Sequence, residues 1–476
     1  MHKPILINNL ELSFPQKSCF ANFNAQIRFG SRIAIIGNNG SGKSTLLKIL
    51  QGKQEPSNGE VIIRSDVIFG YVPQVIEDFN SLSGGERLKK SLTKALALKP
   101  NVLMLDEPTN HLDRNSRKSL MRMLQGYVGT LIIVSHDSEL LRHSINTLWH
   151  INKGEIHSFS GNYDDYLNEL EIKHSSIEQE LSRISYKKKE MHQSLMKEQQ
   201  RAAKSRAKGE KSISQKKWPT IVSKTKVLRS QESSGKKKAQ IESKKQDLID
   251  QFSSLQGEKK IVPKFSLSSD YRSEGAILSI SDGSIGWQHH TSLLQNISLH
   301  MNAKDRIALC GDNGCGKSTL IKAILNNSEV IKTGHWMMPK PMNIGYLDQH
   351  YATLDPEKTV LDTLSLLVPY WPFIKVRKHL NDFLFRKNEE INVKTSQLSG
   401  GEKVRLCLAQ IAACPPQLLI LDEITNNLDL ETKKHVIQVL QDYPGAMLLI
   451  CHEDDFLNQL EITRCYHILN NSLIQN

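Results

Sequence analysis

The sequence predicts an α/β fold made of two tandem domains joined by a long antiparallel α-helical hairpin. IAIIGNNGSGKSTLLK (residues 33–48) recurs 274 residues later as IALCGDNGCGKSTLIK. LSGGERLKKSL and LMLDEPTNHLD, which begin at Leu82 and Leu103, recur 316 residues later as LSGGEKVRLCL and LILDEITNNLD. Internal repeats of this length indicate a duplicated domain. The predicted segments are 1–163 for the first domain, 164–264 for the hairpin and 265–476 for the second domain.

Within each copy, short apolar runs alternate with helical patterns. Ile33–Ile36, Val102–Leu105 and Leu131–Val134 are typical of buried parallel strands. Strands that alternate with helices predict a mostly parallel sheet covered by helices. We expect the functional loops at the carboxyl ends of these strands.

The joining segment has a heptad pattern. Its apolar residues recur every seven positions, at Leu170, Ile177, Ile184 and Met191, and again at Ile241, Leu248 and Leu255. Two heptad stretches around a polar centre predict an antiparallel hairpin. At 1.5 Å per residue, a first arm from about 164 to 207 would be roughly 65 Å long. Gly209 and Trp218-Pro219 interrupt the pattern and predict a loop or short helices at the tip.

Positive charge is concentrated in this hairpin. The chain has 62 basic and 50 acidic residues, a net charge of +12, and residues 171–260 alone hold 23 basic and 11 acidic residues. The remainder is therefore neutral. Most of the excess lies in 197–238, where 14 basic residues face 3 acidic ones. Such a concentration favours a polyanionic partner, although a basic run is also typical of a solvated helix face or a disordered linker.

Composition excludes several classes of protein. With 39% hydrophobic and 24% charged residues, the chain is not disordered throughout. No stretch approaches the roughly 18–20 apolar residues that cross a bilayer, and the N-terminus lacks a signal-peptide core. The seven cysteines form no C-x-x-C pair, which predicts a reduced chain without a metal cluster or a disulfide framework. We therefore expect a cytoplasmic protein.

Each copy contains a phosphate-binding loop, G-x-x-x-x-G-K-[ST], between a strand-like and a helical run. Backbone N–H groups of such a loop, and of the helix that follows it, hold phosphates. Lys43 and Lys317 are predicted to reach the β- and γ-phosphates, and the hydroxyls of Ser44 and Ser318 to ligate Mg²⁺. The predicted ATP-binding residues are Gly37, Asn38, Asn39, Gly40, Ser41, Gly42, Lys43, Ser44 and Thr45, and Gly311, Asp312, Asn313, Gly314, Cys315, Gly316, Lys317, Ser318 and Thr319.

A pair of carboxylates ends a later apolar run in each copy. Asp106 and Asp422 are predicted to contribute to the Mg²⁺ site, and Glu107 and Glu423 to polarise the attacking water. Alone, an acidic pair after a strand is usually a surface loop. Its position downstream of a phosphate loop favours catalysis.

LSGGE, at Ser83 and Ser399, resembles the signature of the ATP-binding cassette (ABC) ATPases. In that family two cassettes meet head to tail, and the signature of one closes over the nucleotide of the other. The resemblance implies that Ser83, Gly84 and Gly85 complete the ATP site of Lys317. It likewise implies that Ser399, Gly400 and Gly401 complete the ATP site of Lys43.

The same resemblance implies further roles. The glutamines that contact metal and water are Gln74 and Gln349, the histidines that sense the γ-phosphate are His136 and His452, and the interface aspartates are Asp113 and Asp429. Phe14 and Trp287 lie where the family stacks an aromatic ring on adenine, and core packing is an equal alternative. The second copy departs from the first at Ile424 for Pro108, Asn427 for His111, Cys451 for Ser135 and Glu453 for Asp137. We expect two competent sites, with slower turnover at Lys317.

Three features resemble the ABC-F branch: tandem cassettes without a membrane span, a basic hairpin, and a short first cassette. Gln74 lies 9 residues before Ser83, whereas Gln349 lies 50 residues before Ser399. The short first cassette and the chain length most resemble the antibiotic-resistance, ribosome-protection subgroup, and GNYDDYL (161–167) also fits the branch. The resemblance implies a monomer with paired cassettes, ATP and Mg²⁺ as cofactors, and a ribosomal partner whose tRNA exit site receives the hairpin beside peptidyl-tRNA.

The hairpin residues expected to contact ribosomal or transfer RNA are Arg201, Lys204, Arg206, Lys208, Lys211, Lys216, Lys217, Lys224, Lys226 and Arg229. Lysine and arginine would meet phosphates largely without reading base sequence. The alternatives are an ATP-binding subunit of an ABC transporter and a DNA-acting ABC ATPase. Protection against a drug and a housekeeping role in translation predict the same ATPase residues.

Overall fold

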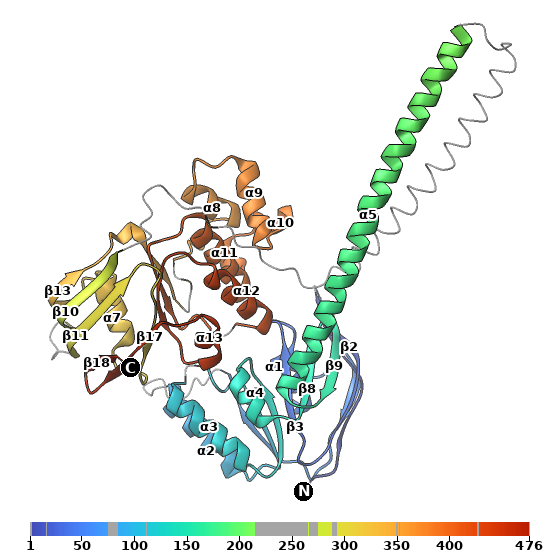
Figure 1. Ribbon diagram of the computed structural model, residues 1–476. Coiled ribbons are helices and arrows are strands. Elements are labelled where there is room, and N and C mark those ends of the chain that lie inside the picture. Colours follow the sequence, from blue (N-terminus) through green and yellow to red (C-terminus); the bar gives the residue numbers. More distant parts are fainter. Residues whose placement is uncertain are drawn as a thin grey trace. The chain divides into compact units, whose positions relative to one another are not determined.

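The computed structural model describes residues 2–15, 17–74, 84–110, 112–214, 265, 275–287, 293–348, 351, 353–425 and 428–475. The chain divides into two compact units. One comprises Met1–Tyr166 and Ile261–Asn476, and the other comprises Leu167–Lys260. The first unit contains both repeats, and most of a single long helix belongs to the second (Figure 1).

The first domain has a six-stranded sheet in the order β5-β6-β7-β3-β8-β9 and a separate three-stranded sheet in the order β2-β1-β4. All neighbours in the larger sheet are parallel except β8 and β9. The elements are β1 (Ile5–Phe14), β2 (Lys17–Ile27), β3 (Arg32–Gly37), α1 (Lys43–Leu50), β4 (Asn58–Ile62), β5 (Phe69–Val72), α2 (Gly84–Ala97), β6 (Val102–Asp106), α3 (Arg114–Gly126), β7 (Thr130–Val134), α4 (Ser138–Ser144), β8 (Thr147–Asn152) and β9 (Glu155–Ser160).

The second domain repeats this topology in one nine-stranded sheet, β13-β10-β11-β18-β17-β12-β16-β15-β14. Its strands β14-β15-β16-β12-β17-β18 match β5-β6-β7-β3-β8-β9 in order. The elements are β10 (Ala276–Trp287), β11 (Leu294–Asn302), β12 (Arg306–Cys310), α7 (Lys317–Ile324), β13 (Val330–Met337), the 3-10 helix Pro341–Asn343, β14 (Ile344–Leu347), α8 (Val360–Leu367), α9 (Phe373–Asp382), α10 (Asn388–Ile391), the 3-10 helix Thr395–Gln397, α11 (Gly400–Ala413), β15 (Leu418–Asp422), α12 (Leu430–Gln441), β16 (Ala446–Ile450), α13 (Asp454–Gln459), β17 (Arg464–Leu469) and β18 (Ser472–Gln475).

The predicted α/β fold class is confirmed. The predicted strands Ile33–Ile36, Val102–Leu105 and Leu131–Val134 lie within β3, β6 and β7. Every residue of β6 and β7 is buried, as expected for parallel strands covered on both faces. Helices α8, α9 and α10 fall in the stretch that is longer in the second copy than in the first.

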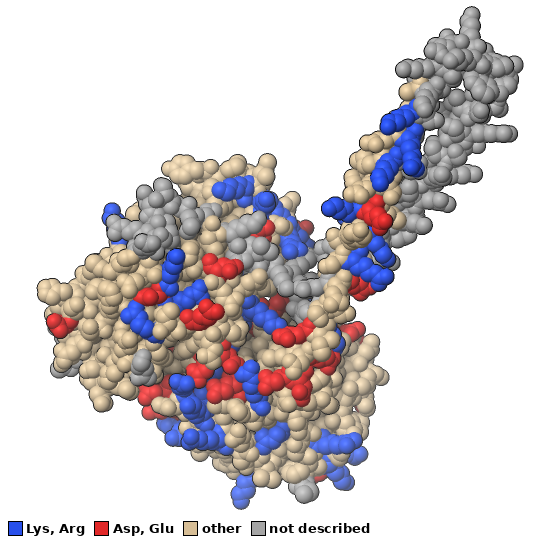
Figure 2. All heavy atoms as spheres, viewed as in Figure 1, with Lys and Arg blue, Asp and Glu red and all other residues tan. Residues whose placement is uncertain are grey.

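The joining segment begins with one helix of 52 residues, α5 (Tyr163–Ser214), which at 1.5 Å per residue is about 78 Å long. Its end lies seven residues beyond the predicted end of the first arm, Ala207. Ile184 and Leu195 are buried and Ile177 and Met191 are half-buried, so the heptad positions form its apolar side. The predicted return arm, 241–255, lies outside the described residues. Lysine and arginine side chains lie along the surface of α5 (Figure 2).

The start of α5 is fixed by its sequence. Asn162 caps the helix, because its side-chain oxygen accepts a hydrogen bond from the Asp165 N–H at 2.8 Å. Tyr163 and Tyr166 are buried, and the Tyr166 hydroxyl lies 2.8 Å from Nδ1 of His150 in the first domain. The GNYDDYL pattern is therefore a helix start with two aromatic anchors. In the part of the chain that the structure describes, no helix is both long and apolar enough to cross a bilayer.

Candidate functional site: two paired nucleotide sites

Both phosphate-binding loops have the backbone that phosphates require. Gly42 and Gly316 cap α1 and α7 in the left-handed region, with φ of 96° and 108°. A Cβ on Gly42 would come within 2.9 Å of Leu12 Cδ2, so the loop also needs glycine for space. The Lys43 Nζ donates to the carbonyl oxygens of Gly37 and Asn38, at 2.7 and 3.2 Å. These loops can therefore cradle phosphates with N–H groups and a lysine.

The second loop repeats this arrangement. The Lys317 Nζ donates to the carbonyl oxygens of Gly311 and Asp312, at 2.8 and 2.9 Å. In the first loop, burial lowers the pKa of Lys43, and Glu107, Asp429 and Asp106 oppose that shift. The carboxylates therefore help keep a largely buried lysine charged.

The serine and aspartate predicted to hold the metal meet in the first domain. Asp106 accepts a hydrogen bond from Ser44, and the Tyr71 hydroxyl lies 3.5 Å from its Oδ2. Its other oxygen, Oδ1, is buried without a hydrogen-bond partner. A buried carboxylate oxygen beside a serine hydroxyl fits Mg²⁺, which takes oxygen ligands. Burial raises the pKa of Asp106, because a buried environment disfavours the charged carboxylate. A bound cation would offset this effect.

The second domain has the corresponding aspartate and a tyrosine that the sequence analysis did not single out. The Tyr346 hydroxyl donates to Asp422 Oδ2 at 3.3 Å. Burial and the neighbouring Glu423 raise the pKa of Asp422 to about 6. Tyr71 and Tyr346 are the first letters of YVPQ and YLDQ. Their shared place in the repeat is the signal that could have found them.

The predicted catalytic glutamates have an unusual backbone. Glu107 and Glu423 have φ of 46° and 50°, a region that residues other than glycine rarely adopt. Their N–H groups donate to the carbonyl oxygens of Val134 and Ile450 on the neighbouring strands, at 2.8 and 3.0 Å. Strain of this kind persists where the surrounding structure imposes it, and it concentrates at functional sites.

Each glutamate is paired with the predicted switch histidine of its own domain. His136 Nε2 lies 3.5 Å from Glu107 Oε1, and His452 Nε2 lies 3.6 Å from Glu423 Oε1. Burial lowers the pKa of His136 well below its ordinary value, and Lys43 and Lys433 act in the same direction. His136 is therefore neutral near pH 7.

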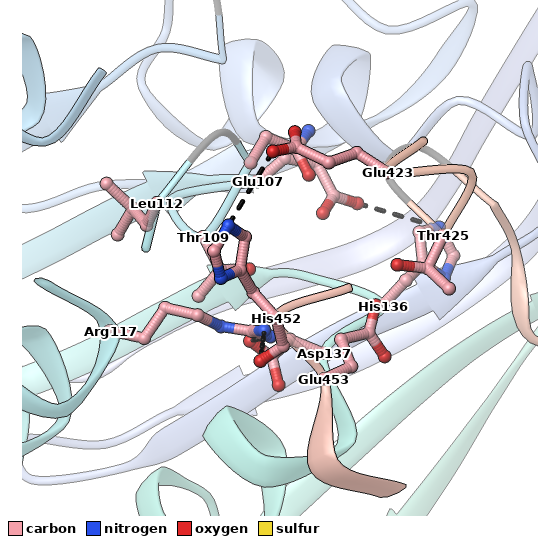
Figure 3. Close-up of a pocket in the computed structure, with 11 residues that line it drawn as sticks. Glu107, Thr109, Leu112, Arg117, His136, Asp137, Glu423, Thr425, His452 and Glu453 are labelled. Atoms are coloured by element: carbon pink, nitrogen blue, oxygen red, sulfur yellow. Dashed lines mark hydrogen bonds and ion pairs between the residues drawn. The ribbon is translucent and has the colours of Figure 1, made fainter. Parts of the chain in front are cut away.

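The two glutamate–histidine pairs line one pocket (Figure 3). The first pair is the more enclosed, since the Glu107 side chain is 9% exposed and that of Glu423 is 24% exposed. The glutamate of the second site is therefore the more accessible to solvent.

The predicted interface aspartates bridge the two domains reciprocally. Asp429 Oδ2 accepts a hydrogen bond from the Asn39 N–H of the first phosphate loop, and Asp113 Oδ2 accepts one from the Asn313 N–H of the second, both at 3.4 Å. Asp113 and Asp429 also cap α3 and α12. Each aspartate thus caps a helix of its own domain and also contacts the phosphate-binding loop of the other domain.

A pair of buried salt bridges was missed by the sequence analysis. Arg117 is bonded to Asp137 in the first domain, and Lys433 to Glu453 in the second. Both partners change together between copies, so the substitution of Glu453 for Asp137 leaves the ion pair in place. A second contact of Arg117 crosses the interface, where it donates to the His452 carbonyl oxygen at 2.8 Å. Aligning α3 with α12 at the 316-residue offset would have revealed the exchange.

The structure describes some, but not all, of the remaining residues that were predicted to bind nucleotide. Ser399 caps α11 and shares a capping box with Glu402, and Gly400 and Gly401 form its first turn, as Gly84 and Gly85 do in α2. Gln74 is exposed just after β5. Ser83 and Gln349 lie outside the described residues. The roles of these residues stay predictions.

The two aromatic residues predicted near adenine lie in different surroundings. Phe14 is 46% exposed, which argues against core packing, and its strand partner Lys17 donates to the Gly40 carbonyl oxygen at 3.1 Å. Trp287 packs partly on the second core, and its ring lies 5.0 Å from the Lys322 Nζ. The structure thus distinguishes a free ring in the first domain from a partly packed ring in the second.

The predicted RNA-contacting residues lie on α5 or beyond it. Arg201 and Lys204 are exposed on this helix. Arg206, Lys208 and Lys211 lie within its bounds. Lys216, Lys217, Lys224, Lys226 and Arg229 lie outside the described residues.

Comparisons with known proteins agree with this geometry. The family model described as "ABC transporter" matches residues 20–74, 68–110 and 294–426. The putative ATP-binding protein YdiF of Bacillus subtilis (strain 168) is 28% identical over 95% of this chain and 78% of its own. The ribosome protection protein VmlR of the same organism is 27% identical over 96% and 86%. The ATP-binding protein Uup of Escherichia coli (strain K12) is 28% identical over 96% and 78%.

A solved structure shows the same fold over most of the chain. It is the archaeal ribosome recycling factor aABCE1, crystallised in complex with the ribosomal stalk protein aP1. The TM-score is 0.61 at 15% identity, covering 96% of this chain and 87% of that chain.

The repeated fold and the two paired sites define a tandem ABC ATPase, which binds ATP with Mg²⁺ and hydrolyses ATP. Within that class the chain is similar over most of its length to the ATP-binding proteins YdiF and Uup and to the ribosome protection protein VmlR.

Proposed function

We propose that this protein is a ribosome-associated ATPase whose basic hairpin enters the tRNA exit site, where it protects the ribosome from antibiotics or regulates translation. Two observations support this proposal. The relative VmlR is named a ribosome protection protein and aligns over nearly the whole chain. The excess positive charge of the chain is confined to the segment that begins with α5.

The observation that carries the proposal is a chain of ion pairs from the cassette interface to the first turn of α5. Asp455, in α13 of the second cassette, is bonded to Arg142 in α4 of the first cassette. The Arg142 Nε also donates to Asp164 Oδ1 at 2.8 Å. Asp455 accepts a further hydrogen bond from the Ser138 hydroxyl at 2.5 Å. Separation of the cassettes would break the two bonds of Asp455, so that Arg142 and the first turn of α5 would lose their link to the second cassette.

This arrangement supports a switch. When ATP is bound, the interface aspartates and the two phosphate loops hold the cassettes together. Glu107 and Glu423 then orient water and accept its proton, and each histidine holds its glutamate in position. Hydrolysis removes the charge that joins the cassettes, and the contact between Arg142 and Asp455 opens. ATP binding would therefore favour a fixed α5, and hydrolysis would favour release from the ribosome.

The chemistry of the hairpin suits RNA. Exposed lysine and arginine side chains such as Lys204 and Arg201 neutralise phosphates and release counterions, which gives affinity without sequence readout. The complex should therefore weaken steeply as the salt concentration rises.

The test is sedimentation with ribosomes on a sucrose gradient. The Glu107→Gln, Glu423→Gln variant should retain ATP and accumulate in the ribosomal fractions. The matched control adds Lys43→Ala and Lys317→Ala, which remove the phosphate contacts and should return the protein to the free fraction. If the double-glutamine variant stays free with ATP present, the ribosome assignment is wrong. Binding to duplex DNA instead would favour the DNA-acting alternative.

A second candidate function, the ATP-binding subunit of a transporter, is favoured by one surface. On α8 and α9 of the second cassette, Leu366, Phe373 and Ile374 are at least 62% exposed, and Tyr370 between the helices is 95% exposed. An apolar patch of this kind marks an interaction surface. If this function holds, the wild-type protein should pellet with membranes, and Tyr370→Ser with Ile374→Ser should abolish pelleting without changing ATP hydrolysis.

A further inference from the structure

Two thiols and an imidazole meet beneath the second phosphate loop. Cys310 is the last residue of β12, and Cys465 and His467 lie on the adjacent parallel strand β17. The Cys310 and Cys465 sulfur atoms are 3.2 Å apart, and the Cys465 sulfur lies 3.5 Å from His467 Nε2. All three ligand atoms lie within 4.8 Å of one another.

Strand register explains why these groups converge. His467 is the direct partner of Cys310 across the ladder, and Cys465 is two residues earlier on the same strand. Residues two apart on a strand point to the same face of the sheet. Ile307 and Leu309 lie in the apolar core, whereas Cys310, Cys465 and His467 are half-buried. The cluster is therefore neither solvent-exposed nor sealed inside the core.

The spacing of the ligand atoms is that of a soft-metal site. Zinc binds cysteine sulfur at about 2.3 Å and histidine nitrogen at about 2.0–2.1 Å in tetrahedral geometry. These bond lengths place sulfur and nitrogen about 3.5 Å apart and two sulfurs about 3.8 Å apart. The observed sulfur–nitrogen distance agrees, and the sulfur atoms need to separate by about half an ångström, which a small side-chain rotation provides. Two thiolates and an imidazole suit zinc better than magnesium or calcium.

The first cassette provides an internal comparison. Strand β3 pairs with β8 in the same register, and there Ile36 and Leu148 occupy the places of Cys310 and Cys465. His150 takes the place of His467, but its Nδ1 is engaged by the Tyr166 hydroxyl at 2.8 Å. The fold itself therefore does not require polar ligands at these positions. The second cassette has both thiols where the first has two aliphatic side chains.

We propose that Cys310, Cys465 and His467 form a zinc site at the base of the second phosphate loop, with water in the fourth position. Cys310 immediately precedes Gly311, whose carbonyl oxygen accepts the hydrogen bond from Lys317. A bound ion would therefore tie β17 to the first residue of the loop that holds ATP. The ligands from the two strands are 155 residues apart in the sequence, which is why the search for C-x-x-C pairs predicted no metal cluster.

The test measures zinc binding by the full-length protein, prepared with a reductant that does not bind metals. Competition with a chromophoric chelator should show one zinc ion per chain, and Co²⁺ should give a thiolate charge-transfer band. Cys310→Ile with Cys465→Leu copies the first cassette and should abolish both signals. The matched control, Cys414→Ser, removes an exposed thiol outside the cluster and should change neither.

The histidine gives a second, graded test. His467→Ala should weaken zinc binding by more than about 100-fold, because even outer-shell partners of zinc contribute 10–100-fold. His150→Ala, at the equivalent position of the first cassette, should leave zinc affinity unchanged. Circular dichroism and ATP binding by each variant establish that it is folded. Equal zinc affinity in the wild type and the double cysteine variant overturns the proposal, and so does a reduced wild type that binds no zinc.

Discussion

Arg117→Met tests the buried ion pair between Arg117 and Asp137 of the first cassette, which has an equivalent in the second cassette. Arg117 and Asp137 have side chains only 7% and 6% exposed. Methionine keeps the length and apolar packing of the side chain but leaves the Asp137 carboxylate buried without its cation. Removing one partner of a buried pair costs about 3–5 kcal/mol. At about 1.4 kcal/mol per factor of ten, local opening of the first cassette should rise by roughly 10²–10³-fold or more.

Amide hydrogen exchange measures this change in the right place. Unfolding of a multidomain chain is not a two-state process, whereas exchange reports the opening of single elements. The amides of Thr130–Val134 in β7 should lose protection in Arg117→Met. Lys433→Met, which breaks the equivalent pair in the second cassette, should leave β7 unchanged and lower the protection of β16.

A double variant separates charge burial from lost packing. Asp137 caps α4 by accepting hydrogen bonds from the N–H groups of Glu139 and Leu140, at 3.1 and 3.2 Å. Asparagine caps helices about as well as aspartate. Arg117→Met with Asp137→Asn should therefore recover most of the lost protection. If the double variant opens as readily as the single one, the cost arises from packing and the electrostatic reasoning is wrong.

Three further outcomes are expected. Glu107→Gln and Glu423→Gln should each slow ATP hydrolysis at their own site by about 10²–10⁴-fold. Glu107→Gln leaves only the Lys317 site active, and because turnover there is predicted to be slower, this variant should have the lower residual ATPase rate. Equal residual rates in the two variants would contradict this. Arg142→Leu should weaken ATP-dependent ribosome binding by up to about 30-fold, since two partly exposed ion pairs contribute about 0.2–1 kcal/mol each. Unchanged binding would show that these ion pairs do not couple the cassettes to α5. Arg201→Glu with Lys204→Glu should reduce both ribosome affinity and its salt dependence, measured by sedimentation at several salt concentrations, and an unchanged salt slope would exclude phosphate contacts at these residues.

Much of the fold could be predicted because the chain repeats itself. The β3 and β12 strands, their glycine loops and the buried β6 and β15 strands follow directly from apolar runs and local motifs. The start of α5 was predicted within one residue, because the heptad pattern begins beside a helix cap. Its end was placed seven residues early, since Ala207 was taken as the last helical position before Gly209, and a single glycine inside a long helix costs only about 1 kcal/mol relative to alanine.

The contacts that complete the site depend on tertiary structure. Arg117 and Asp137 are 20 residues apart, and their pairing follows from the packing of α3 beside α4. The left-handed backbone of Glu107 depends on its hydrogen bond to β7. Local sequence patterns predict neither this ion pair nor this backbone conformation. A comparison of the two copies does, because Lys433 and Glu453 replace Arg117 and Asp137 together.

The proposal that ATP-driven pairing of the cassettes positions the hairpin on the ribosome is tested most directly by cryo-electron microscopy of the Glu107→Gln, Glu423→Gln variant bound to ribosomes with ATP. We expect closed cassettes, an intact Asp455–Arg142–Asp164 contact, and the hairpin lying in the tRNA exit site against RNA phosphates. Closed cassettes with the hairpin directed away from ribosomal and transfer RNA would contradict the claim that ATP-driven pairing positions a basic arm on the ribosome.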